Sequence, residues 1–276
     1  MPETGHSESR GLLDRLVSLP NDSVAKMVIV TVVLSLVCSV LVSSAAVFLK
    51  PMQQRNVELA RKSRILEVAG LLEPGTPVDE LFRQVDVRLV DLETGEYVAD
   101  IDPETYDQRI AARDPNLSKE IPPWEDIAGI NRRARYAPVY LIRDGDELTK
   151  VVIPVHGYGL WSTMYGFLAL SGDGRTVDGL TFYQHAETPG LGGEIENPRW
   201  LGKWAGKSVY GPGGDVRLRV LKGHVDPASE DAQWSVDGIS GATLTAQGVS
   251  RMVQYWLGEE GFGPYLARLK DNKEAA

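Results

Sequence analysis

The sequence has little cysteine and little histidine. Among its 276 residues there is one cysteine, Cys38, and the four histidines are scattered, at positions 6, 156, 185 and 224. One cysteine excludes an internal disulfide, and it excludes an iron–sulfur cluster held by this chain alone. The spacing of the histidines does not indicate a metal site. We therefore predict no metal ligand and no catalytic residue in this chain.

Several motifs are also missing, and basic residues are fewer than acidic ones, at 29 against 38. The chain has no GxxxxGK[ST] phosphate loop, which argues against an ATPase, and no GxSxG elbow, which argues against a hydrolase. Its net charge is −9 with a pI near 5.1, so we predict no nucleic-acid partner. Charged residues make up 24% and hydrophobic residues 43%, as in an ordinary folded protein of one large or two small domains.

One long run lacks charge altogether. Residues 27–49 are uncharged and predominantly apolar, with Lys26 and Lys50 at their two ends. A helix of this length spans roughly 34 Å, which is enough to cross a bilayer. A cleaved signal peptide is the alternative, with Ser43-Ser44-Ala45 as the cleavage site. The apolar run is longer than the usual segment of about 7–15 residues in such peptides, so we predict a retained transmembrane helix.

The basic residues near this run give a first indication of its orientation. More of them follow it than precede it, and the positive-inside rule would then place the larger, C-terminal part in the cytoplasm, although the rule is weaker for long translocated domains. The residues counted are Arg10, Arg15 and Lys26 before the run, and Lys50, Arg55, Arg61, Lys62 and Arg64 after it.

Residues 1–26 and 50–135 are interpreted as separate regions on either side of this helix. The first is polar, with a short amphipathic piece at Leu12–Leu19. The second begins with a juxtamembrane helix over 52–72, ended by Pro74-Gly75-Thr76-Pro77. It continues as an α+β lead-in region.

Within that region the sequence predicts a hairpin and a loop. Val85–Leu89 alternates apolar and polar residues, Tyr97–Ile101 resembles a second strand, and Glu93–Glu96 provides the turn. Pro115–Pro123 is predicted to be a surface loop.

From Pro138 onward the pattern predicts a β-meander. Asp144-Gly145-Asp146 and Ser171–Gly174 are typical hairpin turns, and a short helix is predicted over Pro198–Gly206. The fold class is therefore α+β: a single N-terminal transmembrane helix followed by an antiparallel-sheet domain over 136–276 with flanking helices. The predicted strands are Val139–Arg143, Leu148–Val155, Trp161–Leu170, Thr176–Gln184 and Val216–Lys222.

One late stretch, Asp237–Thr245, has the features of a phosphate site. It offers the hydroxyls of Ser240, Thr243 and Thr245, and the sequence after it has helical periodicity. The hydroxyls therefore lie where a helix begins, next to its unpaired N–H groups and its positive dipole end.

Two further stretches, Gly157–Gly166 and His185–Gly193, are rich in glycine. The first alone is typical of a turn and a strand with Trp161 and Tyr165 in the core. The second alone is typical of a glycine loop with His185 as a surface or hydrogen-bonded residue. The alternative is that their glycines let backbone N–H groups approach a planar, phosphorylated ligand.

DGISGAT, residues 237–243, resembles the D-x-x-[ST]-G-A-[ST] signature of the FMN-binding domain that a flavin transferase modifies. Asp237, Ser240, Gly241, Ala242 and Thr243 all match the signature. The resemblance implies that Thr243 carries covalent FMN through a phosphoester, which would make the chain a phosphoprotein. It leaves two roles for Asp237, namely an Asx-type bond in the turn or recognition by the transferase. Thr245 falls outside the signature.

Two other runs support the same resemblance. ETPGLG is the second hallmark of this domain and is interpreted as a wall of the flavin pocket. GLWSTMYG, residues 159–166, is similar to the version in the C subunit of the Na+-translocating NADH:quinone oxidoreductase (Na+-NQR). These runs add Glu187, Thr188, Gly190, Leu191, Gly192, Leu160 and Trp161 to the predicted FMN contacts.

The resemblance implies an electron-relay subunit of a complex that oxidises NADH, reduces ubiquinone and exports Na+. Its partners would be the A, B, D, E and F subunits, the membrane, and a flavin transferase during maturation. It also implies a single-pass protein of the bacterial inner membrane with residues 1–26 cytoplasmic and the flavin domain periplasmic, against the count of basic residues. Two alternatives are the G subunit of an Rnf-type ferredoxin-linked complex and a non-redox membrane-anchored binding or assembly module.

Overall fold

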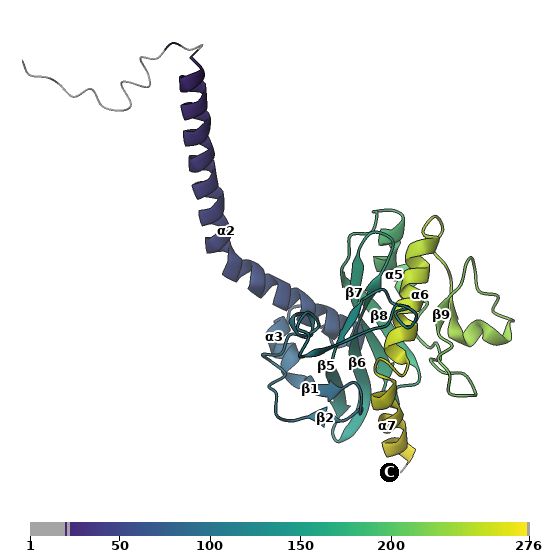
Figure 1. Ribbon diagram of the computed structural model, residues 1–276. Coiled ribbons are helices and arrows are strands. Elements are labelled where there is room, and N and C mark those ends of the chain that lie inside the picture. Colours follow the sequence, from purple (N-terminus) through teal and green to yellow (C-terminus); the bar gives the residue numbers. More distant parts are fainter. Residues whose placement is uncertain (1–19, 21–22, 275–276) are drawn as a thin grey trace, which may run out of the picture. The chain divides into compact units, whose positions relative to one another are not determined.

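The computed structural model describes residue 20 and residues 23–274 (Figure 1). The amphipathic piece predicted at Leu12–Leu19 lies outside the described residues. The chain separates into two compact units, residues 1–57 and 58–276. Each unit is described by itself.

A single long helix, α2, covers Val24–Ala69. It contains the whole predicted transmembrane run and most of the predicted juxtamembrane helix, because Pro51 lies inside the helix and does not end it. Its apolar part is long enough to cross a membrane, and none of that part is buried against protein, unlike a core helix. The helix ends at Ala69, earlier than predicted, since Gly70 has a φ of +74° and the N–H of Leu71 donates to the Leu66 carbonyl.

The second unit is built on one six-stranded antiparallel sheet in the order β2-β1-β5-β6-β7-β8. The predicted meander and the predicted hairpin are both confirmed, and the hairpin pairs Leu89 with Val98. The strands are β1 (Asp86–Asp91), β2 (Tyr97–Val98), β5 (Tyr136–Asp144), β6 (Glu147–Tyr158), β7 (Thr163–Ser171) and β8 (Val177–Gln184).

Smaller elements surround this sheet. The helices and turns of 3₁₀ type are α3 (Val78–Leu81), η1 (Phe82–Gln84), α4 (Gln108–Ala111), η2 (Gly192–Glu196), α5 (Pro198–Leu201), η3 (Glu230–Trp234), α6 (Thr243–Leu257) and α7 (Gly263–Glu274). Two short strand pairs complete the unit, β3 (Ser118–Glu120) with β4 (Arg132–Ala134), antiparallel, and β9 (Arg219–Val220) with β10 (Ser235–Val236), parallel.

Three predictions of local structure were wrong. The loop predicted at Pro115–Pro123 contains β3, whose partner lies 14 residues away and is not visible in local sequence. The strand predicted over Val216–Lys222 is reduced to Arg219–Val220 and belongs to a separate two-stranded sheet. The strand predicted to begin at Trp161 begins at Thr163, and Trp161 is 65% exposed, so its interpretation as a core residue is wrong, whereas its contact with the flavin stays a prediction.

Both faces of the main sheet are covered. In β6 the odd-numbered residues Val151, Ile153 and Val155 join the core that includes α6, whereas Val152 joins a second core that includes Ile65 of α2. This alternation follows from the two-residue period of a strand. Helix α6 lies over β6 in Figure 1 and contributes the predicted apolar face.

The contact between α6 and β6 is close. A Cβ atom on Gly157 would lie 2.8 Å from Cβ of Met252, so only glycine fits there. One turn further along the helix, the indole Nε1 of Trp256 donates to the His156 carbonyl over 2.6 Å. These contacts fix the position of the helix on the end of the sheet, and therefore the position of its first residue.

We expect Leu168→Ala to lower the free energy of unfolding of the second unit by about 2–5 kcal/mol, because the Leu168 side chain is fully buried in the main core. Ile110→Ala is the control, since Ile110 is 68% exposed, and its effect should stay within about 0.5 kcal/mol. All six tryptophans lie after residue 58, so urea unfolding of the full chain in detergent, followed by tryptophan fluorescence, reports on this unit. Equal midpoints for the two variants would contradict the assigned core.

Candidate functional site

The structure brings the three glycine-rich or hydroxyl-rich stretches together around one side chain, Glu187. Its carboxylate accepts hydrogen bonds from the backbone N–H groups of Leu160 (3.1 Å), Trp161 (2.9 Å) and Ser162 (3.2 Å). It also accepts one from the Thr245 hydroxyl over 2.6 Å. Glu187 therefore joins the loop between β6 and β7 to the first turn of α6, and it does so from the ETPGLG run.

The Glu187 carboxylate is buried, at 4% exposure, and is ionised. Burial alone would raise its pKa. The hydrogen bonds from the Thr245 hydroxyl and from the three backbone N–H groups outweigh that effect and hold the pKa below its ordinary value of 4.5. A buried carboxylate without such donors would be strongly destabilising. These four donors explain how an anion is accommodated at the junction of the three stretches.

Two glycines make room for this arrangement. A Cβ atom on Gly159 would lie 2.5 Å from the Glu187 carboxylate, and one on Gly192 would lie 2.6 Å from the Thr245 hydroxyl. Gly248 of α6 is equally restricted, because its Cβ would lie 2.6 Å from the Tyr158 carbonyl. The glycines at 159 and 192 therefore allow close packing within the protein around Glu187.

The hydroxyls of the Asp237–Thr245 stretch have different surroundings. Thr245 is 1% exposed and its hydroxyl donates a hydrogen bond to Glu187, whereas Ser240 and Thr243 are exposed. Thr243 is the first residue of α6. Thr245, which the signature leaves out, is therefore a structural residue, and its short bond to Glu187 was not predicted from the sequence.

The start of α6 is open to a ligand. Ala242 occupies the N-cap position and no side chain caps the helix, so its first N–H groups have no intrahelical partner. Gly241 precedes it with a φ of +76°, a conformation that favours glycine. A hollow beside Thr243 is also lined by Lys222, an exposed basic residue that the sequence motifs do not include. Uncapped amides, a helix dipole and a lysine fit a phosphate group.

Asp237 has a supporting position. Its carboxylate accepts from the Val225 N–H (2.7 Å) and from the Lys203 ammonium (2.5 Å), and its carbonyl accepts from the Trp200 indole. Burial tends to raise its pKa, but Lys203, the Val225 N–H and His224 lower it to about 2. The turn is therefore stabilised by bonds to residues 200–225 in place of the Asx-type bond within its own turn.

Apolar side chains stand exposed on the stretches that meet here. Leu160 and Trp161 lie on the loop before β7, Leu191 on the ETPGLG run and Leu244 on the first turn of α6. Leu191 packs against the signature, since its Cδ2 lies 3.0 Å from where a Cβ on Gly241 would be. The hollow beside Thr243 has a volume of about 60 Å³ and is not lined by these four side chains, which stand exposed outside it.

The ETPGLG run itself is a tight turn. The Thr188 carbonyl accepts from the N–H groups of both Leu191 and Gly193, and Gly190 has a φ of +74°. Its exposed residues, Thr188, Gly190 and Leu191, are directed by this turn, whereas Glu187 is buried beneath it. The run thus combines one structural residue with several accessible ones.

Comparison with known proteins agrees with this site. Residues 159–258, which contain all three stretches except the first two residues of Gly157–Gly166, match the FMN-binding domain family. The chain is 48% identical over 253 residues to the C subunit of the Na+-translocating NADH-quinone reductase of Pseudomonas aeruginosa PAO1, covering 90% of this chain and 97% of that protein. It is also 48% identical to the C subunit of the Vibrio alginolyticus reductase, covering 92% of this chain and 98% of that protein.

Solved structures give the same result. The crystal structure of Shewanella oneidensis NqrC matches with a TM-score of 0.70 and 36% identity, over 78% of this chain and 97% of that one. The C subunit of the Parabacteroides distasonis Na+-translocating NADH-quinone reductase matches with a TM-score of 0.62 and 26% identity, over 79% of this chain and 96% of that one.

The fold and the matched region define an FMN-binding domain protein with a long apolar N-terminal helix. More particularly, the chain belongs to the family of the C subunits of Na+-translocating NADH-quinone reductases, and it is a subunit of an oxidoreductase complex. The two alternatives, the G subunit of an Rnf-type complex and a non-redox module, are not favoured.

We expect Glu187→Gln to lower the free energy of unfolding at pH 7 by at least about 1.5 kcal/mol, because hydrogen bonds to a charged acceptor are replaced by weaker ones. The pKa of Glu187 is lower in the folded state than its ordinary value of 4.5. Its contribution is therefore complete above that pH and is lost as the pH falls through the lower, folded value. The difference between the variant and the wild type should accordingly shrink toward pH 3.

Urea unfolding at pH 7, 5 and 3 measures this difference. Glu230→Gln is a matched control, because Glu230 is exposed and its loss removes the same charge. A Glu187→Gln effect that is absent at pH 7, or that grows on acidification, would contradict the ionised and hydrogen-bonded state of Glu187.

Proposed function

We propose that Thr243 carries FMN through a phosphoester to its hydroxyl. The observation that carries this proposal is the difference between the two threonines at the start of α6. Thr243 is exposed at an uncapped helix start, whereas Thr245 is buried and its hydroxyl is bound by Glu187. A modifying enzyme therefore has access to Thr243 and not to Thr245.

The residues around Thr243 suit a phosphate ester. The unpaired N–H groups of the first turn of α6 would donate to its oxygens, and the dipole of the helix would stabilise its negative charge. Lys222 lines the adjacent hollow and would supply a counter-charge. Gly241, with its positive φ, brings the chain sharply into the helix next to this position.

The exposed apolar residues give a place for a flavin ring. We propose that Leu160, Trp161, Leu191 and Leu244 contact the isoalloxazine, with the backbone of Thr188, Gly190 and Gly192 beside it. The Glu187 hydrogen bonds hold the loop of Leu160 and Trp161 in place for this contact. A ring on an open surface would remain accessible to a neighbouring redox group, as an electron relay needs.

The signature then divides into two parts. Asp237 is ion-paired with Lys203 and stabilises the preceding turn. Ser240 and Gly241 are exposed next to Thr243. We propose that a flavin transferase recognises this exposed part, and that Asp237 and Ala242 shape the backbone that presents it.

Bound FMN accepts and donates one or two electrons, and this is the chemistry that the chain itself lacks. The chain would position the flavin between its neighbours in the complex. We propose that these partners are the A, B, D, E and F subunits, and that the complex oxidises NADH, reduces ubiquinone and exports Na+. The absence of an NAD-binding fingerprint from the sequence is consistent with a relay that depends on partners.

We propose the following organisation in the bacterial inner membrane. Residues 1–26 are cytoplasmic and residues 27–49 of α2 cross the membrane. Residues 50–135 form the lead-in region, and residues 136–276 form the FMN-binding domain on the periplasmic side. The exposed, uncharged surface of α2 over 27–49 supports the single membrane crossing.

We expect Thr243→Ala to abolish covalent flavin, because the attachment hydroxyl is lost. Mass spectrometry of the denatured chain, produced together with a flavin transferase, should show the mass of one FMN on the wild type and none on the variant. Thr105→Ala is the control, since Thr105 is exposed and lies outside the signature, and this variant should keep the flavin. A Thr243→Ala chain that still carries covalent FMN would overturn the assignment.

The proposed orientation predicts a labelling pattern in intact bacterial cells. The single cysteine simplifies the design: in a Cys38→Ala background, Glu230→Cys and Ser7→Cys are introduced separately. A membrane-impermeant maleimide should label position 230, which is exposed on the second unit, and should label position 7 only after lysis. Labelling of position 7 alone in intact cells would support the orientation that the basic residues indicate.

A further inference from the structure

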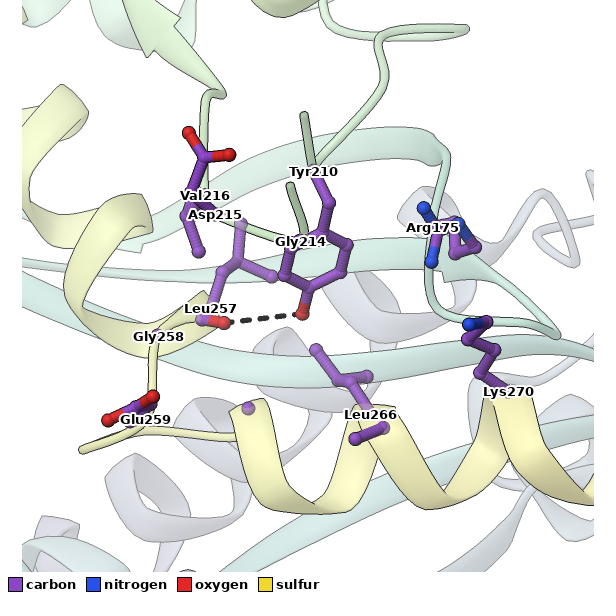
Figure 2. Close-up of a pocket in the computed structure, with 12 residues that line it drawn as sticks. Arg175, Tyr210, Gly214, Asp215, Val216, Leu257, Gly258, Glu259, Leu266 and Lys270 are labelled. Carbon is purple, nitrogen blue, oxygen red and sulfur yellow. Dashed lines mark hydrogen bonds between the residues drawn. The ribbon is translucent and has the colours of Figure 1, made fainter. Parts of the chain in front are cut away.

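A separate hollow lies where α6 ends and α7 begins (Figure 2). It has a volume of about 420 Å³, within the usual range of about 300–1,000 Å³ for small-molecule sites. Its lining is predominantly apolar and includes Val216, Leu257, Leu266, Ala267 and the ring of Tyr210. The hollow is not lined by any residue that we assign to the flavin.

Charge is unevenly distributed around this hollow. The cationic groups of Arg175 and Lys270 lie on one side, and the carboxylates of Asp215 and Glu259 lie on the other (Figure 2). Asp215 is compensated by Arg217, whose Nε lies 3.4 Å from it. The positive side and the apolar lining together define the kind of ligand that fits.

Arg175 is the cation available to a ligand. Its guanidinium lies 5.7 Å from the centre of the Tyr210 ring, and the ion pairs found among the described residues do not include it. A partly buried guanidinium has five N–H donors and always carries its charge. It therefore favours an anion that presents two acceptor oxygens, such as a carboxylate.

The Tyr210 side chain is neutral and does not balance the positive charge of Arg175. Its hydroxyl donates to the Leu257 carbonyl over 3.2 Å. Burial raises its pKa to about 12, although the charge of Arg175 opposes that effect. Tyr210 is thus neutral at physiological pH, with its ring facing the hollow and its polar group already satisfied.

We propose that this hollow binds a small monocarboxylate with an apolar body. The carboxylate would pair with Arg175, and the apolar body would cover Leu257, Leu266 and Val216. Gly214, which has no side chain and has no atom within 4 Å of where a Cβ would be, leaves space at the hollow open. This site is independent of the flavin attachment, so it stands whether or not Thr243 is modified.

The test uses 3-phenylpropionate as the probe and the full chain in lipid nanodiscs, with empty nanodiscs as the blank. Saturable binding is expected by titration calorimetry and by saturation-transfer NMR. The neutral analogue 3-phenylpropan-1-ol should bind at least about tenfold more weakly, because a hydrogen bond to a charged group is lost.

Three variants locate the site. Arg175→Gln should weaken 3-phenylpropionate at least about tenfold while leaving the neutral alcohol unchanged. Ala267→Trp, at an exposed lining position, should block both compounds by filling the hollow. Arg251→Gln removes the same charge from an exposed position outside the hollow and should have no effect. No saturable binding to the wild type, or equal binding to wild type and Ala267→Trp, would overturn the proposal.

Discussion

The geometry of the site depends on one buried carboxylate with four donors. Glu187 receives three backbone N–H groups from a single loop and one hydroxyl from the first turn of α6. The carboxylate therefore connects the loop to the start of the helix. Because a buried charge is stable only while its donors are in place, the three segments are constrained together. The exposed residues that we assign to the flavin all lie next to this constraint.

Close backbone packing determines where α6 begins. Gly157 leaves room for the Met252 side chain, and Gly248 leaves room for the Tyr158 carbonyl. The helix therefore packs directly on the end of β6. The helix is therefore fixed along its length by the sheet and at its first turn by Glu187. Thr243 sits at the exposed end of a well-anchored element and not on a mobile loop. A flavin attached at Thr243, as we propose, would therefore keep a constant position relative to the sheet.

Much of the fold was predictable from the sequence, because the patterns that indicate its elements are local. Two-residue alternation indicated the meander, turn residues indicated its hairpins, and apolar periodicity indicated α6. The bond between Glu187 and Thr245 was not predictable, because it joins residues 58 positions apart. For the same reason the pairing of β3 with β4 was missed. Of the two interpretations of Trp161, the core residue is wrong, because the side chain is 65% exposed and lies before β7, whereas its contact with the flavin stays a prediction.

The loop at 160–162 is attached to Glu187 through its main chain alone. Amide N–H groups are the same for every residue except proline, so these bonds do not specify which side chains the loop carries. Substitution at Leu160 or Trp161 can therefore alter the polarity and bulk beside the site without releasing the loop. Glu187 fixes the position of the loop through main-chain hydrogen bonds. The two apolar side chains of the loop can therefore vary, under selection or design, without loss of these bonds.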